Sequence, residues 1–142
     1  MAAPPSRPRA RRLLVVDDEP HIGLLLRLQL EARGYELLLA RNLFEARGVL
    51  ADPDRPDAML LDLHLPDGSG VDLLRELRER PATAAMPVLV LTAEGEERIL
   101  AEARRLGATT ITKPFSPSKL TAQVAALMGG GGSDAAPPPA AT

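Results

Sequence analysis

The sequence predicts an α/β fold in which a parallel five-stranded sheet is covered by helices on both faces. Five short apolar runs alternate along the chain with five stretches of helical periodicity. The runs are apolar at consecutive positions rather than at every second position, which is typical of strands buried on both sides. The 142 residues, of which 45% are hydrophobic, are enough to bury one core.

The first half of the chain predicts two strands, each followed by a helix. Leu13–Val16 form the first apolar run, and a helical pattern with apolar residues near a 3.6-residue period begins at about Pro20. A second apolar run covers residues 35–40. Asn42 can cap a second helix, which we expect to end before Pro53.

The second half of the chain predicts three more strand and helix units. The apolar runs that predict the strands cover residues 58–63, 88–91 and 109–112. The helices between them are expected at about 71–80 and 95–106. Ser116 can cap a last helix, with Pro117 at its first position.

The composition changes at both ends of the chain. Residues 1–9 hold three prolines, and residues 129–142 read GGGGSDAAPPPAAT, so neither end can bury an apolar face. We therefore expect one domain over residues 10–128, an N-terminal disordered tail, and a C-terminal disordered tail or linker. The first 12 residues carry four arginines and no acid, which leaves a net charge of −6 on the rest of the chain. We expect this basic arm to be a solvated tail.

The composition also excludes several classes of function. The chain has no cysteine, which rules out a disulfide framework, a thiolate zinc site and a cysteine nucleophile. One tyrosine and two phenylalanines are too few for a platform that stacks nucleic-acid bases. No apolar stretch approaches the roughly 20 residues of a membrane-spanning helix. We expect no secretory signal, because the apolar run Leu13–Val16 is short and ends in acids. We expect a cytoplasmic protein without a membrane or direct nucleic-acid partner.

Chemically active side chains stand at the ends of four of the five predicted strands. They are Asp17 and Asp18 at the end of the first strand, Asp62 at the end of the third, Thr92 at the end of the fourth and Lys113 at the end of the fifth. Because the carboxyl ends of parallel strands meet at one edge of a sheet, we expect these groups to converge. Carboxylates are the hard oxygen ligands that Mg²⁺ prefers. A carboxylate can also act as the nucleophile in phosphoryl transfer, with a lysine and a hydroxyl beside the phosphoryl oxygens.

The residues at these strand ends resemble those of response-regulator receiver domains in bacterial two-component signalling. The matching motifs occur in the family's order and near its spacings: VVDDEP at 15–20, LLDLHLPDGSG at 60–70, VLTA at 90–93 and TKPF at 112–115. The resemblance covers residues 11–128. It implies the flavodoxin-like, three-layer α/β/α fold of chemotaxis-type receivers, with strand order 2-1-3-4-5.

The resemblance also implies a role for each residue at the strand ends. Asp62 is the expected phosphoacceptor, Thr92 the switch hydroxyl and Lys113 the phosphate-binding cation. The expected ligands of Mg²⁺ are Asp17, Asp18, Asp62 and the backbone carbonyl of His64.

The implied function is phosphorelay signalling rather than enzymatic turnover. A histidine kinase or histidine phosphotransfer protein would donate a phosphoryl group to Asp62, and the change would switch a surface that binds an unknown downstream protein. Slow self-phosphorylation from small donors and autodephosphorylation are the most catalysis that we expect. A weak homodimer is compatible with the resemblance.

One position keeps a second hypothesis open. The family commonly has an aromatic residue three positions before the lysine, where this chain has Thr110. The alternative is a pseudo-receiver that acts as an interaction module independent of phosphorylation.

Three further features have structural interpretations. The Gly68-Ser69-Gly70 segment lacks the third glycine of a dinucleotide-binding loop, because Leu73 stands in its place, so we expect a turn into the third helix. The leucine-rich stripe at 24–30 is predicted to be core. The His64 side chain is predicted to lie at the rim of the acidic pocket.

Overall fold

The computed structural model describes residues 11–93, 95–112 and 116–128. Its strands are β1 (Arg12–Val16), β2 (Glu36–Ala40), β3 (Ala58–Asp62), β4 (His64–Leu65), β5 (Gly68–Ser69), β6 (Val88–Thr92) and β7 (Thr109–Thr112). Its helices are α1 (Pro20–Glu31), α2 (Leu43–Ala51), α3 (Gly70–Glu79), α4 (Glu97–Arg105) and α5 (Pro117–Leu127). The predicted tails, 1–9 and 129–142, lie outside the described residues.

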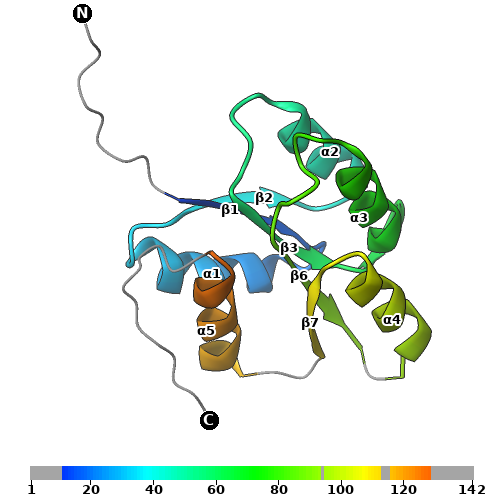
Figure 1. The fold of residues 1–142 in the computed structure, drawn as a ribbon. Helices are drawn as coiled ribbons and strands as arrows, with labels where there is room; N and C mark the ends of the chain where they lie inside the picture. Colours follow the sequence, from blue (N-terminus) through cyan, green and yellow to red (C-terminus); the bar gives the residue numbers. More distant parts are fainter. Residues whose placement is uncertain (1–10, 94, 113–115, 129–142) are drawn as a thin grey trace, which may run out of the picture.

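The five longer strands form one parallel sheet in the order β2-β1-β3-β6-β7. This is the predicted order 2-1-3-4-5, since the short strands β4 and β5 stand apart from the main sheet. Helices α2, α3 and α4 cover one face of the sheet, and α1 and α5 cover the other (Figure 1). The predicted three-layer α/β/α architecture is confirmed.

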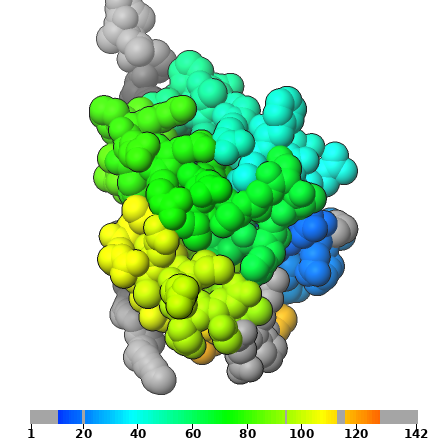
Figure 2. Space-filling model, turned by 90° about the vertical axis from the view of Figure 1, so that its right-hand side faces the viewer, coloured from blue at the N-terminus to red at the C-terminus, as the bar shows by residue number. Residues whose placement is uncertain are grey.

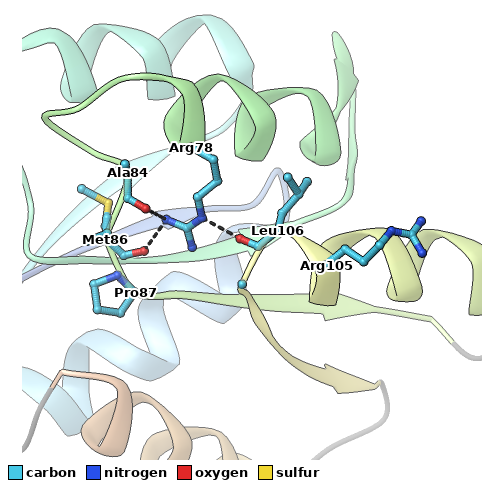
Figure 3. A pocket seen from close by; sticks show the side chains of 8 residues that line it. Arg78, Ala84, Met86, Pro87, Arg105 and Leu106 are labelled. Carbon is cyan, nitrogen blue, oxygen red and sulfur yellow. Dashed lines mark hydrogen bonds between the residues drawn. The ribbon is translucent and has the colours of Figure 1, made fainter.

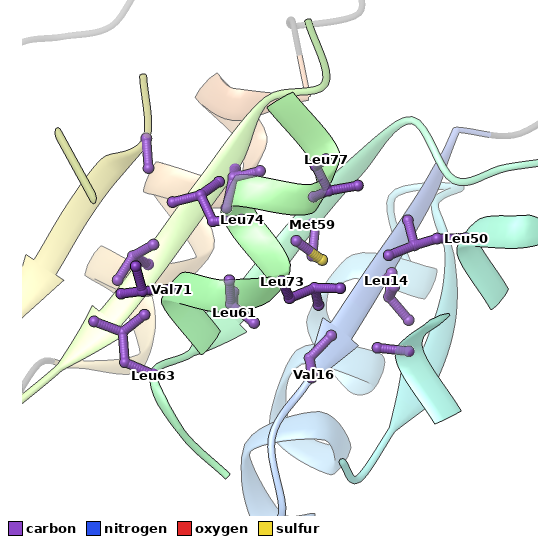
Figure 4. Close-up of a cluster of buried hydrophobic side chains, with 14 of the residues drawn as sticks. Leu14, Val16, Leu50, Met59, Leu61, Leu63, Val71, Leu73, Leu74 and Leu77 are labelled. Atoms are coloured by element: carbon purple, nitrogen blue, oxygen red, sulfur yellow. The ribbon is translucent and has the colours of Figure 1, made fainter. Parts of the chain in front are cut away.

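Consecutive residues of each central strand supply opposite sides of the core. In β3, Met59 and Leu61 pack under α2, α3 and α4 (Figure 4), whereas Ala58 and Leu60 pack against α1 and α5. All five residues of β3 and all five of β6 are buried. Such burial explains why these runs are apolar at every position, because each large side chain removed from water contributes about 1.5–3 kcal/mol.

Both helix caps predicted from the sequence are confirmed. The Asn42 side chain accepts a hydrogen bond from the Glu45 amide at 2.8 Å at the start of α2. The Ser116 hydroxyl accepts from the Lys119 amide at 3.1 Å, with Pro117 as the first residue of α5. Each cap satisfies an amide that has no partner inside its own helix.

Helix α1 buries a narrower stripe than the sequence predicts. Ile22, Leu26 and Leu30, spaced four residues apart, pack into the core. Leu24 and Leu28 are 58% and 77% exposed, so the prediction that the whole 24–30 stripe is core was wrong for them. Residues two positions apart on a helix point in different directions, and only one side of α1 faces the sheet and α5.

None of the helices in the described ranges is long and apolar enough to cross a membrane.

Figure 2 shows the face on which α3 and α4 lie side by side.

The contrast along α1 gives a test of the core assignment. Replacing Leu26, which is fully buried, with alanine should lower the free energy of unfolding by about 2–5 kcal/mol, because a cavity remains. The matched control Leu28→Ala should change it by no more than about 0.5 kcal/mol. Urea denaturation measures both. Equal losses in the two variants would contradict the described packing of α1.

Candidate functional site

Three carboxylates meet at the carboxyl edge of the sheet, where β1 and β3 end. The two strands are paired with Val16 opposite Leu61, so Asp17 and Asp62 are the next residues on neighbouring strands. One carboxylate oxygen from each of Asp17, Asp18 and Asp62 lies within 4.8 Å of the other two. Asp17 and Asp62 are only 6% and 5% exposed, whereas Asp18 is open to solvent. The structure thus brings together the three predicted acids.

The loops that leave the strands fix the two buried carboxylates. The Glu19 amide donates to Asp17 Oδ1 at 2.7 Å, and the His64 amide donates to Asp62 Oδ1 at 2.9 Å. In each case the amide belongs to the residue two positions further along the chain. Each acid is therefore oriented by the backbone of its own strand-to-helix loop.

The loop after β3 turns back tightly beneath the site. The His64–Leu65 strand pairs with Gly68–Ser69 in a short hairpin that the sequence analysis did not predict. Gly70 follows the hairpin, and its amide donates to the Leu63 carbonyl at 2.9 Å. A Cβ atom on Gly70 would lie 2.6 Å from the Asp62 carbonyl oxygen, so this approach requires glycine. The predicted turn into the third helix is confirmed, and Ser69 caps α3.

Thr92 lies at the same edge, at the end of β6. Asp62 pairs with Leu91, so Thr92 is the residue that follows the strand partner of Asp62. Thr92 is 1% exposed, and its hydroxyl is 3.4 Å from the carbonyl oxygen of Ala93. Thr112 pairs with Thr92 at the end of β7. Lys113 comes next in the chain and lies outside the described residues.

The His64 side chain joins the loop after β3 to the start of α4. Its Nε2 lies 2.7 Å from Oε1 of Glu96, the N-cap residue of α4. The His64 side chain is 59% exposed, in agreement with the predicted position at the rim. The sequence analysis missed Glu96, because a side-chain contact between distant segments leaves no periodic signal in the sequence.

Two further contacts join α3 to α4. Arg75 Nη2 lies 2.5 Å from Glu102 Oε2, and Arg78 Nε donates to the Leu106 carbonyl at 2.6 Å. Together with the contact between His64 and Glu96, they connect the start, the middle and the end of α4 to α3 and to the loop after β3. A displacement of the loop beside Asp62 can therefore reach α4 directly.

Asp67, at the turn of the hairpin, connects it to α2. Its carboxylate accepts hydrogen bonds from the Leu43 and Phe44 amides at 2.8 and 3.1 Å. The Leu43 hydrogen bond is the largest influence that lowers the pKa of Asp67 below its usual value. Asp67 is thus held as a carboxylate at the amino end of α2, where negative charge is favoured.

The carboxylate cluster suits a divalent cation that prefers oxygen ligands. Three acids this close repel one another, and two of them are largely removed from water. A Mg²⁺ ion would offset that repulsion and complete its coordination with carbonyl oxygens and water.

Thr110, the position that differs from the family pattern, lies on β7. It is half-buried, and its hydroxyl accepts from Arg104 Nη2 at 3.2 Å. A polar contact between β7 and α4 thus occurs where an aromatic ring is common in the family.

Comparison with known proteins identifies the family. Residues 13–125 match the sequence profile described as the response regulator receiver domain. The chain is 41% identical over 119 residues to the phosphate regulon transcriptional regulatory protein PhoB of Pseudomonas aeruginosa, covering 83% of this chain and 52% of that protein. It is 38% identical over 119 residues to the alkaline phosphatase synthesis transcriptional regulatory protein PhoP of Bacillus subtilis. That match covers 83% of this chain and 48% of the relative. The chain spans about half the length of these curated relatives.

Solved structures agree with the sequence match. A putative response regulator from Chloroflexus aurantiacus superposes with a TM-score of 0.74 at 32% identity, covering 84% of this chain and 98% of that one. The non-phosphorylated HemR receiver domain from Leptospira biflexa superposes with a TM-score of 0.75 at 31% identity. The match covers 84% of this chain and 94% of that one.

The close approach at Gly70 gives a test of how the site is built. Gly70→Ala should lower the free energy of unfolding by about 1–3 kcal/mol, because the new methyl group displaces the backbone at Asp62. Gly48 in α2 has no atom within 4 Å of an added Cβ, so Gly48→Ala should instead raise stability by about 0.5–1 kcal/mol. Thermal unfolding measures both changes. A stabilised Gly70→Ala variant would show that the loop does not need to lie this close to Asp62.

Proposed function

The chain belongs to the response regulator receiver domain family, and we propose that Asp62 is its phosphoacceptor and that phosphorylation switches a protein-binding surface. The observation that carries the proposal is the position of Asp62, a nearly buried carboxylate with two other acids beside it at a sheet edge. We extend the proposal to residues 10–128 as the functional domain, a range that contains the matched residues 13–125.

The proposed metal is Mg²⁺, held by Asp17, Asp18 and Asp62, with the His64 backbone carbonyl as a fourth ligand predicted from the family. When bound, it would neutralise charge on the oxygens of the phosphoryl group. The three carboxylates would fix its position next to Asp62. Two of the three are themselves oriented by amides of their own loops.

The reaction is a displacement at phosphorus. A carboxylate oxygen of Asp62 attacks, and the bond between phosphorus and the donor's histidine nitrogen breaks. An acyl-phosphate forms on Asp62, and the nitrogen leaves with its electron pair. Small donors such as acetyl phosphate can replace the histidine donor, which accounts for the slow self-phosphorylation that we propose.

Thr92 and Lys113 are the proposed ligands of the phosphoryl oxygens. The 3.4 Å contact between the Thr92 hydroxyl and the Ala93 carbonyl is long, so it costs little to turn the hydroxyl toward a new acceptor. The role of Lys113 rests on the family resemblance.

The proposed readout is a shift of α4 relative to α3. His64 belongs to the loop that holds Asp62, and its side-chain contact with Glu96 reaches the start of α4. A phosphoryl group on Asp62 adds charge and volume beside this loop, which biases the equilibrium between two positions of α4. The proposed partners are a histidine kinase or phosphotransfer protein as donor and a downstream protein as target, in the cytoplasm.

The second candidate, a pseudo-receiver, is favoured by one observation. Thr110 forms a polar contact with Arg104 where the family commonly has an aromatic residue. A module of this kind would bind its partner, or itself, with the same affinity whether or not Asp62 is modified.

Phosphorylation of Asp62 is tested directly by mass spectrometry. With Mg²⁺ and acetyl phosphate, the chain should gain the mass of one phosphoryl group. Asp62→Asn should gain none, because an amide is not a nucleophile of this kind. The matched control Asp52→Asn changes an exposed acid at the far end of α2 and should be modified like the original chain. An unmodified original chain, or an Asp62→Asn variant that is still modified, would contradict the proposal.

A further inference from the structure

Two hollows flank the turn over residues 80–87, which connects α3 to β6 at the edge of the sheet opposite the acids. One, of about 390 Å³, lies between this turn, α2 and α3, and its lining includes Arg55 and Arg80. The other, of about 470 Å³, lies between the turn and the end of α4, and its lining includes Arg78 and Arg105. We call these two hollows together the arginine surface.

The charge of the arginine surface is largely uncompensated. Arg55, Arg80 and Arg105 take part in none of the ion pairs between described residues. Arg47 is paired with Glu76 at 2.7 Å, and Glu76 also attracts Arg80 over a longer distance. Glu76 is the only acid in the lining of either hollow, so the arginines there outnumber the acids.

Arg78 adds a further positive charge beneath this surface. Its guanidinium donates to the Leu106 carbonyl at 2.6 Å, the Met86 carbonyl at 2.8 Å and the Ala84 carbonyl at 3.1 Å (Figure 3). Its described partners are neutral carbonyls, so no carboxylate cancels its charge. Partial burial lowers the pKa of Arg78 from its usual value, yet an arginine remains charged at neutral pH.

The floors of the hollows are apolar. Leu50, Leu73 and Leu77 lie under the first hollow, and Met86 and Pro87 border the second. These leucines and Met86 are themselves at most 8% exposed, and the exposed apolar groups of the two linings are Ala82, Ala84, Ala85 and Pro87. Arginine beside exposed apolar groups is a composition that favours protein interfaces.

The turn between the hollows is rigidly held. The Thr83 hydroxyl donates to the Leu77 carbonyl at 2.8 Å, and the Met86 amide donates to the Thr83 carbonyl at 3.0 Å. With the two bonds from Arg78 to the Ala84 and Met86 carbonyls, the turn is preorganised. A partner that binds here would lose little free energy to ordering it.

We propose that the arginine surface is a docking site for an acidic protein segment that carries apolar side chains. The arginines match its carboxylates, and the exposed alanines and Pro87 of the turn contact its apolar groups. The opposite edge of the sheet holds Asp17, Asp18 and Asp62 and repels such a segment, which orients its approach. A nucleic acid fits less well, because none of the lining residues is aromatic and phosphates gain nothing from an apolar floor.

The test uses the full chain and a short fluorescein-labelled peptide of alternating glutamate and leucine. Fluorescence anisotropy should show saturable binding, and amide shifts in NMR spectra should change at residues 82–86 and 105–107. The R55E/R80E/R105E variant should bind at least about tenfold more weakly, because three favourable charge contacts become repulsive.

The matched control is R33E/R98E/K119E, which changes the net charge equally at three exposed positions elsewhere. It should bind the peptide like the original chain. Equal weakening of both triple variants, tighter binding of a DNA duplex, or equal binding of polyglutamate would overturn the proposal. Both variants should still be phosphorylated on Asp62, so this result is independent of the proposed phosphoacceptor function.

Discussion

The parallel pairing of β1 with β3 is the constraint on which the site depends. With Val16 opposite Leu61, the next residue of each strand is an aspartate, and both strands end at the same edge. A slip of one residue would also turn every apolar side chain of β3 to the wrong face of the sheet. Because β3 is buried on both faces, the packing that stabilises the core also fixes the distance between Asp17 and Asp62.

This pairing places the carboxylates of Asp17 and Asp62 at the edge of the hydrophobic core, where burying a negative charge is unfavourable. Carboxylates this close repel one another, and backbone amides directed at Asp17 and Asp62 offset part of that repulsion. The rest of the molecule is arranged around the same edge. Helix α4 is joined to the loop beside Asp62 through His64, and arginines outnumber acids in the two hollows at the opposite edge.

Much of this organisation could be predicted from the sequence. Runs of apolar residues, the caps at Asn42 and Ser116, and acids at the strand ends are local signals, and each was found where it was expected. The pairing of His64 with Glu96 and the bond from Arg78 to the Leu106 carbonyl could not be predicted, because they join positions 32 and 28 residues apart and depend on how α4 packs. The exposure of Leu28 was missed for a related reason, since only the packed structure shows which side of α1 is covered.

The most direct test of the site is an NMR titration of the chain with Mg²⁺. If the pairing of β1 with β3 builds a cation site, saturable amide shifts should be concentrated at residues 17–19 and 62–64. They should disappear in an Asp17→Asn variant that retains the fold. Shifts that do not saturate, or that are spread over surface acids remote from Asp62, would show that the three carboxylates do not form this site.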